Sequence, residues 1–164
     1  MITKAPTLIF TWGNPSRGDD AIGPRIYELL EGKAYDTVEL LTDFQLQVEH
    51  AVDLEDRDRI LFVDASASGQ SPFEFYQLHP ETDNSYTTHA LSPSSLLSVY
   101  TKVNASNPAP AFMLSVRGYS FELGDDVSAK ADENITRAVM FIESLLKLDH
   151  TADWQHECQS MCAD

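Results

Sequence analysis

The chain has 164 residues, 43% of them hydrophobic, and its 26 acidic and 11 basic side chains give a formal charge of -15. This length and hydrophobic content suffice for one ordinary domain with a core and do not support two. The negative charge would repel phosphate backbones and anionic lipids, so we expect neither nucleic acid nor a membrane as a partner.

Cysteine usage and hydropathy indicate the compartment. Cys158 and Cys162 both lie close to the C-terminus, so they cannot form a disulfide scaffold for the fold and favour a reducing environment. No apolar leader follows Met1, and no stretch of about 18 apolar residues occurs. We therefore expect a cytoplasmic protein without a membrane anchor.

Strand and helix patterns alternate along the first half of the chain. The apolar, β-branched run at residues 7–12 is typical of a strand buried on both faces. Apolar residues at helical spacing from Ile22 to Leu30 follow an Asp pair and precede Gly32, which predicts a helix that opens near Asp20. The other predicted elements of this half are a strand at residues 37–41, a weaker helical segment at 46–54 and a strand at 59–64.

The second half continues the alternation. Its predicted elements are a strand at residues 73–78, a helix that begins at Ser92-Pro93, a strand at 111–116 and an amphipathic helix at 135–146. This order predicts an α/β fold with three layers, in which helices cover both faces of a mostly parallel twisted sheet. We expect one domain over residues 1–150 and a polar, flexible tail over 151–164.

Two carboxylates are expected at one edge of this sheet. Asp20 follows the first strand and Asp64 ends the third, and ligands of parallel sheets bind beyond the carboxyl ends of the strands. Taken alone, Asp20 could be a helix-capping acid and Asp64 a solvated strand end. Taken together, two such carboxylates favour a cation.

The loop at residues 13–20 has glycines that also suit a phosphate site. However, neither phosphate-binding glycine motif is present, and the pair Asp19-Asp20 would repel a phosphate at the helix start. We therefore interpret the loop as one wall of a cation site, in which Asp19 caps or supports and Asp20 binds.

Several short motifs occur in the order found in the hydrogenase maturation endopeptidases, and the chain resembles that family over roughly residues 7–148. The motifs are Gly13-Asn14, Gly18-Asp19-Asp20-x-x-Gly23, Phe62-Val63-Asp64-Ala65, and Thr88-His89 before a Leu-rich helix. Each motif alone is weak, but the ordered set is fairly specific.

The resemblance implies a peptidase domain that trims a C-terminal extension from the large-subunit precursor of a nickel–iron hydrogenase after nickel insertion. The family's metal ligands fall on Asp20, Asp64 and His89. Asp43 falls where many members have an acid before two glycines, which Phe44-Gln45 replaces here. We expect this difference to affect how the loop meets its substrate.

The implied ligands, two carboxylates and one imidazole, suit nickel, zinc or manganese and leave positions for water and substrate. By resemblance the ion is the nickel already held by the precursor, although zinc or cadmium would fit the same ligands. We expect the ion to orient the peptide and to polarise the scissile carbonyl or a water, with Asp20 or Asp43 as proton acceptor. No G-x-S-x-G motif supplies a serine nucleophile.

Two other functions remain open at this point. One is a non-catalytic domain that binds a metal or the hydrogenase subunit as a chaperone, and the other is a different metal-assisted hydrolase on the same framework. For the leading hypothesis we expect a monomer whose only macromolecular partner is the precursor.

Overall fold

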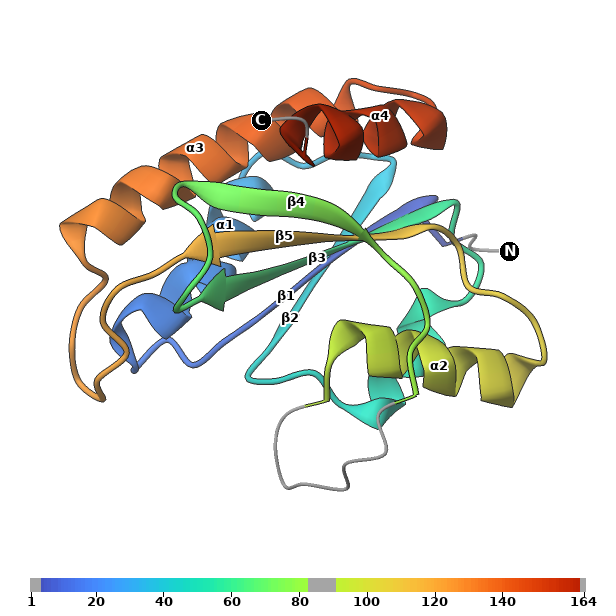
Figure 1. The fold of residues 1–164 in the computed structure, drawn as a ribbon, viewed down its shortest axis with the longest axis horizontal. Coiled ribbons are helices and arrows are strands. Elements are labelled where there is room, and N and C mark those ends of the chain that lie inside the picture. Colours follow the sequence, from blue (N-terminus) through green and yellow to red (C-terminus); the bar gives the residue numbers. More distant parts are fainter. Residues whose placement is uncertain (1–3, 83–90, 163–164) are drawn as a thin grey trace.

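The computed structural model describes residues 4–82 and 91–162 (Figure 1). Its five strands form one sheet in the order β2-β1-β3-β5-β4. The strands are β1 (Thr7–Trp12), β2 (Val38–Asp43), β3 (Arg59–Ser66), β4 (Phe73–Leu78) and β5 (Ala111–Arg117). All neighbouring pairs are parallel except β4 and β5, which are antiparallel, so β4 is an antiparallel edge strand.

Helices cover both faces of the sheet, which confirms the predicted three-layer α/β fold. One layer holds α1 (Ile22–Glu31), α3 (Ala129–Leu146) and α4 (Thr151–Cys162), and the other holds α2 (Pro93–Asn104) and the 3-10 segment η2 (Val48–Leu54) (Figure 1). Each layer packs its own hydrophobic core against the sheet. No helix in the described part of the chain is long and apolar enough to cross a membrane.

Local sequence signals explain where the main helices begin. The Ser92 hydroxyl accepts a hydrogen bond from the Ser95 backbone N–H at 3.1 Å, and Pro93 opens α2, as predicted. The helix expected near Asp20 begins instead as a short 3-10 turn, η1 (Gly18–Ala21), and becomes α-helical at Ile22. The apolar stripe predicted for residues 135–146 is buried in α3.

The prediction of a flexible tail is wrong for the segment that forms α4. Trp154 is fully buried, and its indole N–H donates to the Leu145 carbonyl at 2.9 Å. The Arg59 guanidinium lies 4.2 Å from the centre of the Trp154 ring. Cys158, one helical turn further on, is also buried, so two apolar residues on one face anchor an otherwise polar segment.

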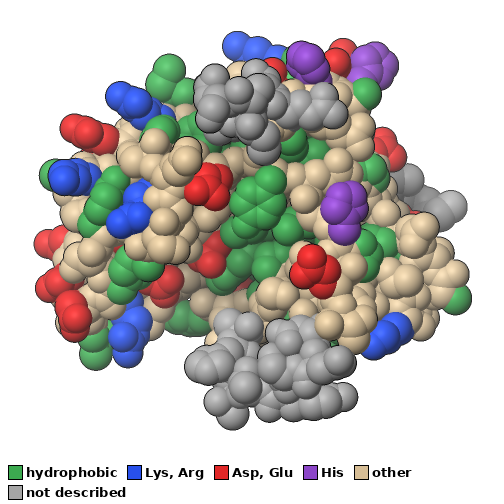
Figure 2. Space-filling view, in the orientation of Figure 1, with side chains coloured by type: hydrophobic (Ala, Val, Ile, Leu, Met, Phe, Trp, Pro, Cys, Tyr) green, Lys and Arg blue, Asp and Glu red, His purple; other side chains and the backbone are tan. Residues whose placement is uncertain are grey.

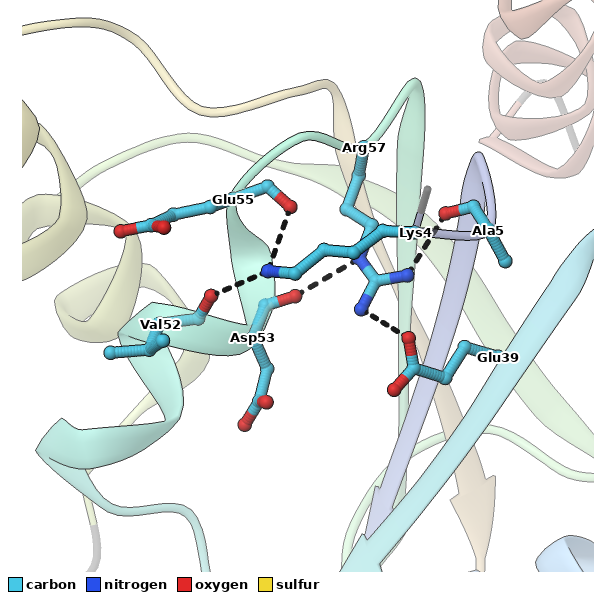
Figure 3. A network of polar contacts seen from close by, with 7 residues as sticks. All are labelled: Lys4, Ala5, Glu39, Val52, Asp53, Glu55 and Arg57. Carbon is cyan, nitrogen blue, oxygen red and sulfur yellow. Dashed lines mark hydrogen bonds and ion pairs between the residues drawn. The ribbon is translucent and has the colours of Figure 1, made fainter. Parts of the chain in front are cut away.

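A polar network ties the amino ends of the strands together, opposite the candidate site (Figure 3). The side chain of Arg57 is 1% exposed and donates to the carbonyls of Asp53 and Ala5, at 3.0 and 2.9 Å. It also pairs with the Glu39 carboxylate at 2.5 Å. Arg57 therefore joins η2, the segment before β1, and β2 through one buried cation.

We expect Arg57→Met to lower the free energy of unfolding by about 2–4 kcal/mol, because two carbonyls and one carboxylate lose a buried, charged donor. Lys4→Met is the matched control, since Lys4 is exposed and donates to the Val52 and Glu55 carbonyls of the same network. Urea denaturation measures both variants. An equal, small loss in the two would contradict a structural role for Arg57.

Candidate functional site

The register of the strands places five side chains in one row across the sheet, near the carboxyl ends of the parallel strands. Asp43 pairs with Trp12, and Ser115 pairs with both Asp64 and Glu74. Trp12 follows the Thr11–Val63 pair, so it lies beside Asp64. By the alternation of strand side chains, the row faces the α2 layer, to whose core Trp12, Phe62 and Met113 belong.

Within this row, Asp64 has a pKa far above its ordinary value. Its pKa is raised to about 7: burial is the largest cause and the nearby charge of Asp20 adds to it, while hydrogen bonds from the Ala65 N–H and the Trp12 indole act in the opposite direction. The structure thus brings Asp20 and Asp64 close enough to repel each other. A cation between the two carboxylates would relieve both the burial cost and the repulsion.

Asp20 is held by the loop that precedes it. Its Oδ2 accepts the Asn14 backbone N–H at 2.7 Å, and the Asn14 side chain accepts the Ser16 N–H at 2.9 Å. Gly13 has a φ of +150°, and a Cβ there would lie 2.0 Å from the Asp20 carbonyl oxygen. Only glycine lets the loop pass this close to the turn that carries Asp20.

Asp19 makes different contacts from its neighbour Asp20. It is fully buried, and its carboxylate accepts the backbone N–H groups of Tyr119, Ser120 and Ser128 and the Ser128 hydroxyl. Burial alone would raise the pKa of Asp19, but these hydrogen bonds together outweigh it and lower the pKa below 3.8. Asp19 therefore fixes η1 against the segment that leads into α3.

Asp43 lies two strands away from Asp64, roughly 10 Å at the backbone, since β1 separates β2 from β3. Its Oδ1 accepts the Phe44 N–H at 2.7 Å, and its Oδ2 lies 3.1 Å from His50 Nε2. The geometry therefore places Asp43 at the same edge as Asp20 and Asp64 without bringing it between them.

A shallow pocket of about 280 Å³ adjoins Asp43 on the side of the loop after β1. It is lined by Gly13, Pro15, Pro24, Thr42, Asp43 and Phe44. The Phe44 side chain is 66% exposed, although it is large and apolar. Phe44 thus puts an exposed aromatic ring beside the candidate site.

His89, the third predicted ligand, lies outside the described residues. Within residues 4–82 and 91–162, no group of three or more His, Cys, Asp or Glu side chains is arranged to hold a metal ion. Asp20 and Asp64 thus provide a two-carboxylate pair among the described residues, and the predicted trio stays a prediction.

Sequence reasoning missed three neighbours of the predicted acids. Trp12 donates to Asp64, His50 contacts Asp43, and the pKa of Tyr76 is raised by burial, then by the charges of Glu74 and Asp64. Trp12 and Asp64 belong to one row of the sheet, so the strand register would have revealed this contact once the strand order was known. On the face that Figure 2 shows, a strip of hydrophobic surface lies between β4 and α2, with acidic side chains on both sides of it.

No protein-family model and no curated protein matches this sequence. Among solved structures, the [NiFe] hydrogenase maturation protease HycI from Thermococcus kodakarensis KOD1 is similar, with 25% identity and a TM-score of 0.69 over 88% of this chain and 94% of that chain. The Escherichia coli hydrogenase maturating endopeptidase HybD is 24% identical, with a TM-score of 0.68 over 86% and 91% of the two chains. A hydrogenase 2 maturation peptidase from Thaumarchaeota archaeon SCGC_AB-539-E09 is 22% identical, with a TM-score of 0.63 over 87% and 99%.

Proposed function

We infer that this chain is a member of the hydrogenase maturation endopeptidases, because it has the fold of a solved maturation protease and also carries the family's motifs in order. We propose that it is an endopeptidase that removes a C-terminal extension from the large-subunit precursor of a nickel–iron hydrogenase. The observation that carries this proposal is the partly buried Asp64 carboxylate beside Asp20, at the carboxyl edge of the sheet. The carboxyl edge is the place where an α/β sheet binds its ligands.

The nickel ion of the precursor would be part of the substrate. The residues fit such an ion, since two carboxylates are held near each other by backbone and indole donors that leave oxygen lone pairs for a cation. His89 would be the third ligand. Zinc or cadmium would suit the same ligands in the isolated protein.

Each residue of the site then has a definite task. Asp20 and Asp64 bind the ion and so position the peptide attached to it, while the Asn14 N–H and the Trp12 indole orient these two carboxylates. The bound ion would polarise the scissile carbonyl or a water. Asp20 or Asp43 would accept the proton that the attacking water loses.

The direct test is the intact mass of a purified nickel-loaded precursor before and after incubation with the protein. We expect one discrete loss from its C-terminus with the wild type and none with Asp20→Asn. Asp36→Asn, in the turn before β2, is the matched control and should cleave like the wild type. An unchanged precursor mass with bound wild-type protein would instead indicate a chaperone.

The remaining expectations belong to the same proposal. We propose that the enzyme acts in the cytoplasm, because its cysteine usage favours a reducing compartment. We also propose that it acts as a monomer.

A further inference from the structure

The imidazole of His50 is held on three sides at the edge of the candidate site. Its Nδ1 accepts the Gln47 backbone N–H at 2.8 Å, and its Nε2 lies 3.1 Å from Oδ2 of Asp43. The ring packs edge-on against Phe10, with 4.6 Å between the ring centres. The side chain is 13% exposed, whereas that of Asp43 is 39% exposed.

These contacts determine which nitrogen of His50 carries the hydrogen. Because Nδ1 accepts from a backbone N–H, it must be the unprotonated nitrogen, so Nε2 carries the hydrogen and donates it to Asp43. Protonation of Nδ1 would set two N–H groups against each other at 2.8 Å. The backbone of η2 thus selects the neutral tautomer that donates to the carboxylate.

The arrangement also fixes Asp43. One carboxylate oxygen accepts the Phe44 N–H at 2.7 Å and the other accepts from His50, so neither oxygen can rotate without losing a hydrogen bond. His50 also closes a capping box with Gln47 at the start of η2. Capping requires only Nδ1, so it does not account for the contact that Nε2 makes with the exposed acid.

We propose that His50 is a positioning residue for the peptidase reaction, which holds the Asp43 carboxylate in the orientation in which it meets the substrate. The inference rests on the proposed function and adds to it a residue that acts through Asp43. It assigns to η2 the task of carrying this donor to the carboxyl edge of the sheet.

The test compares steady-state cleavage of the nickel-loaded precursor by His50→Phe, His50→Gln and the wild type. His50→Phe keeps the packing on Phe10 and loses the donor, and we expect kcat to fall by roughly 10-fold or more with KM changed by less than about 2-fold. His50→Gln restores an N–H donor and should recover kcat to within about 3-fold of the wild type. His79→Phe, at an exposed histidine after β4, is the control and should leave both constants unchanged.

A double-mutant cycle distinguishes positioning from a purely structural role. In an Asp43→Ala background, His50→Phe should have no further effect on kcat, because the residue it positions is already absent. Additive losses, or no rescue by His50→Gln, would overturn the inference. If the wild type itself fails to cleave the precursor, the proposed function fails first, and 15N NMR of the imidazole still reports whether Nε2 carries the hydrogen.

Discussion

Replacing Asp64 with asparagine is expected to reduce cleavage strongly and, at neutral pH, to stabilise the fold. The ionised Asp64 carboxylate is costly because its partial burial and the charge of Asp20 both disfavour the charged form. Asparagine keeps the shape and removes the charge, together with the anionic oxygen that an ion needs. We expect cleavage of the nickel-loaded precursor to fall by roughly 100-fold or more.

The stability gain should depend on pH in one direction. The pKa of Asp64 is about 7 in the folded protein, against 3.8 in the unfolded chain, so the native state binds the extra proton between these values. Below about pH 4 the wild type has no penalty, and the penalty grows as the pH rises to about 7, to at most about 4 kcal/mol. The advantage of Asp64→Asn over the wild type should grow over the same window.

Urea denaturation in the presence of a chelator, at pH 5 and pH 8, measures this difference. Asp20→Asn is the informative companion, because loss of the Asp20 charge should lower the pKa of Asp64 and shift the window to lower pH. The charge of Asp64 also acts on the Tyr76 hydroxyl, so the stability of Tyr76→Phe should be measured at the same two pH values. The same pH dependence of stability in the wild type and Asp64→Asn would contradict an Asp64 carboxylate whose ionised form is disfavoured by burial and by Asp20.

Replacing Asp19 with alanine is expected to have the opposite effect on stability, a loss of about 3–5 kcal/mol. The substitution leaves three backbone N–H groups and one hydroxyl without their buried acceptor. Because the pKa of Asp19 is below 3.8 in the folded state, its contribution is present at higher pH. It should be lost as the pH falls through that lower value.

Thermal unfolding at pH 7 and pH 3 measures the loss for Asp19→Ala, and Asp126→Ala, an exposed acid of the neighbouring segment, serves as the control. The difference between Asp19→Ala and the wild type should shrink in acid. If both variants unfold like the wild type, Asp19 does not hold η1. The adjacent acids Asp19 and Asp20 would then not have the separate roles that their contacts indicate.

The strands and most helices were predictable because their signals are local. A buried strand reads as an apolar run, and α2 begins where a hydroxyl precedes a proline. Helix α4 was not predictable in this way, because its anchoring depends on Trp154 meeting Arg59 from a distant strand. A polar segment with one buried tryptophan resembles a tail until the partner is known.

The site was predictable to the same extent. Asp20 and Asp64 could be placed at one edge because parallel strands share their carboxyl ends. The raised pKa of Asp64 could not be predicted from the sequence, since it depends on how far the side chain is buried beside Asp20. The contact of His50 with Asp43 depends on the fold of η2, whose pattern is weak in the sequence.

Crystals of the protein can show whether Asp20 and Asp64 bind one metal ion together. Anomalous diffraction from crystals soaked with zinc tests it most directly. We expect one strong peak within about 2.0–2.2 Å of a carboxylate oxygen from each residue, and its loss in Asp64→Asn crystals. No peak between the two carboxylates, in crystals that bind zinc elsewhere, would contradict it.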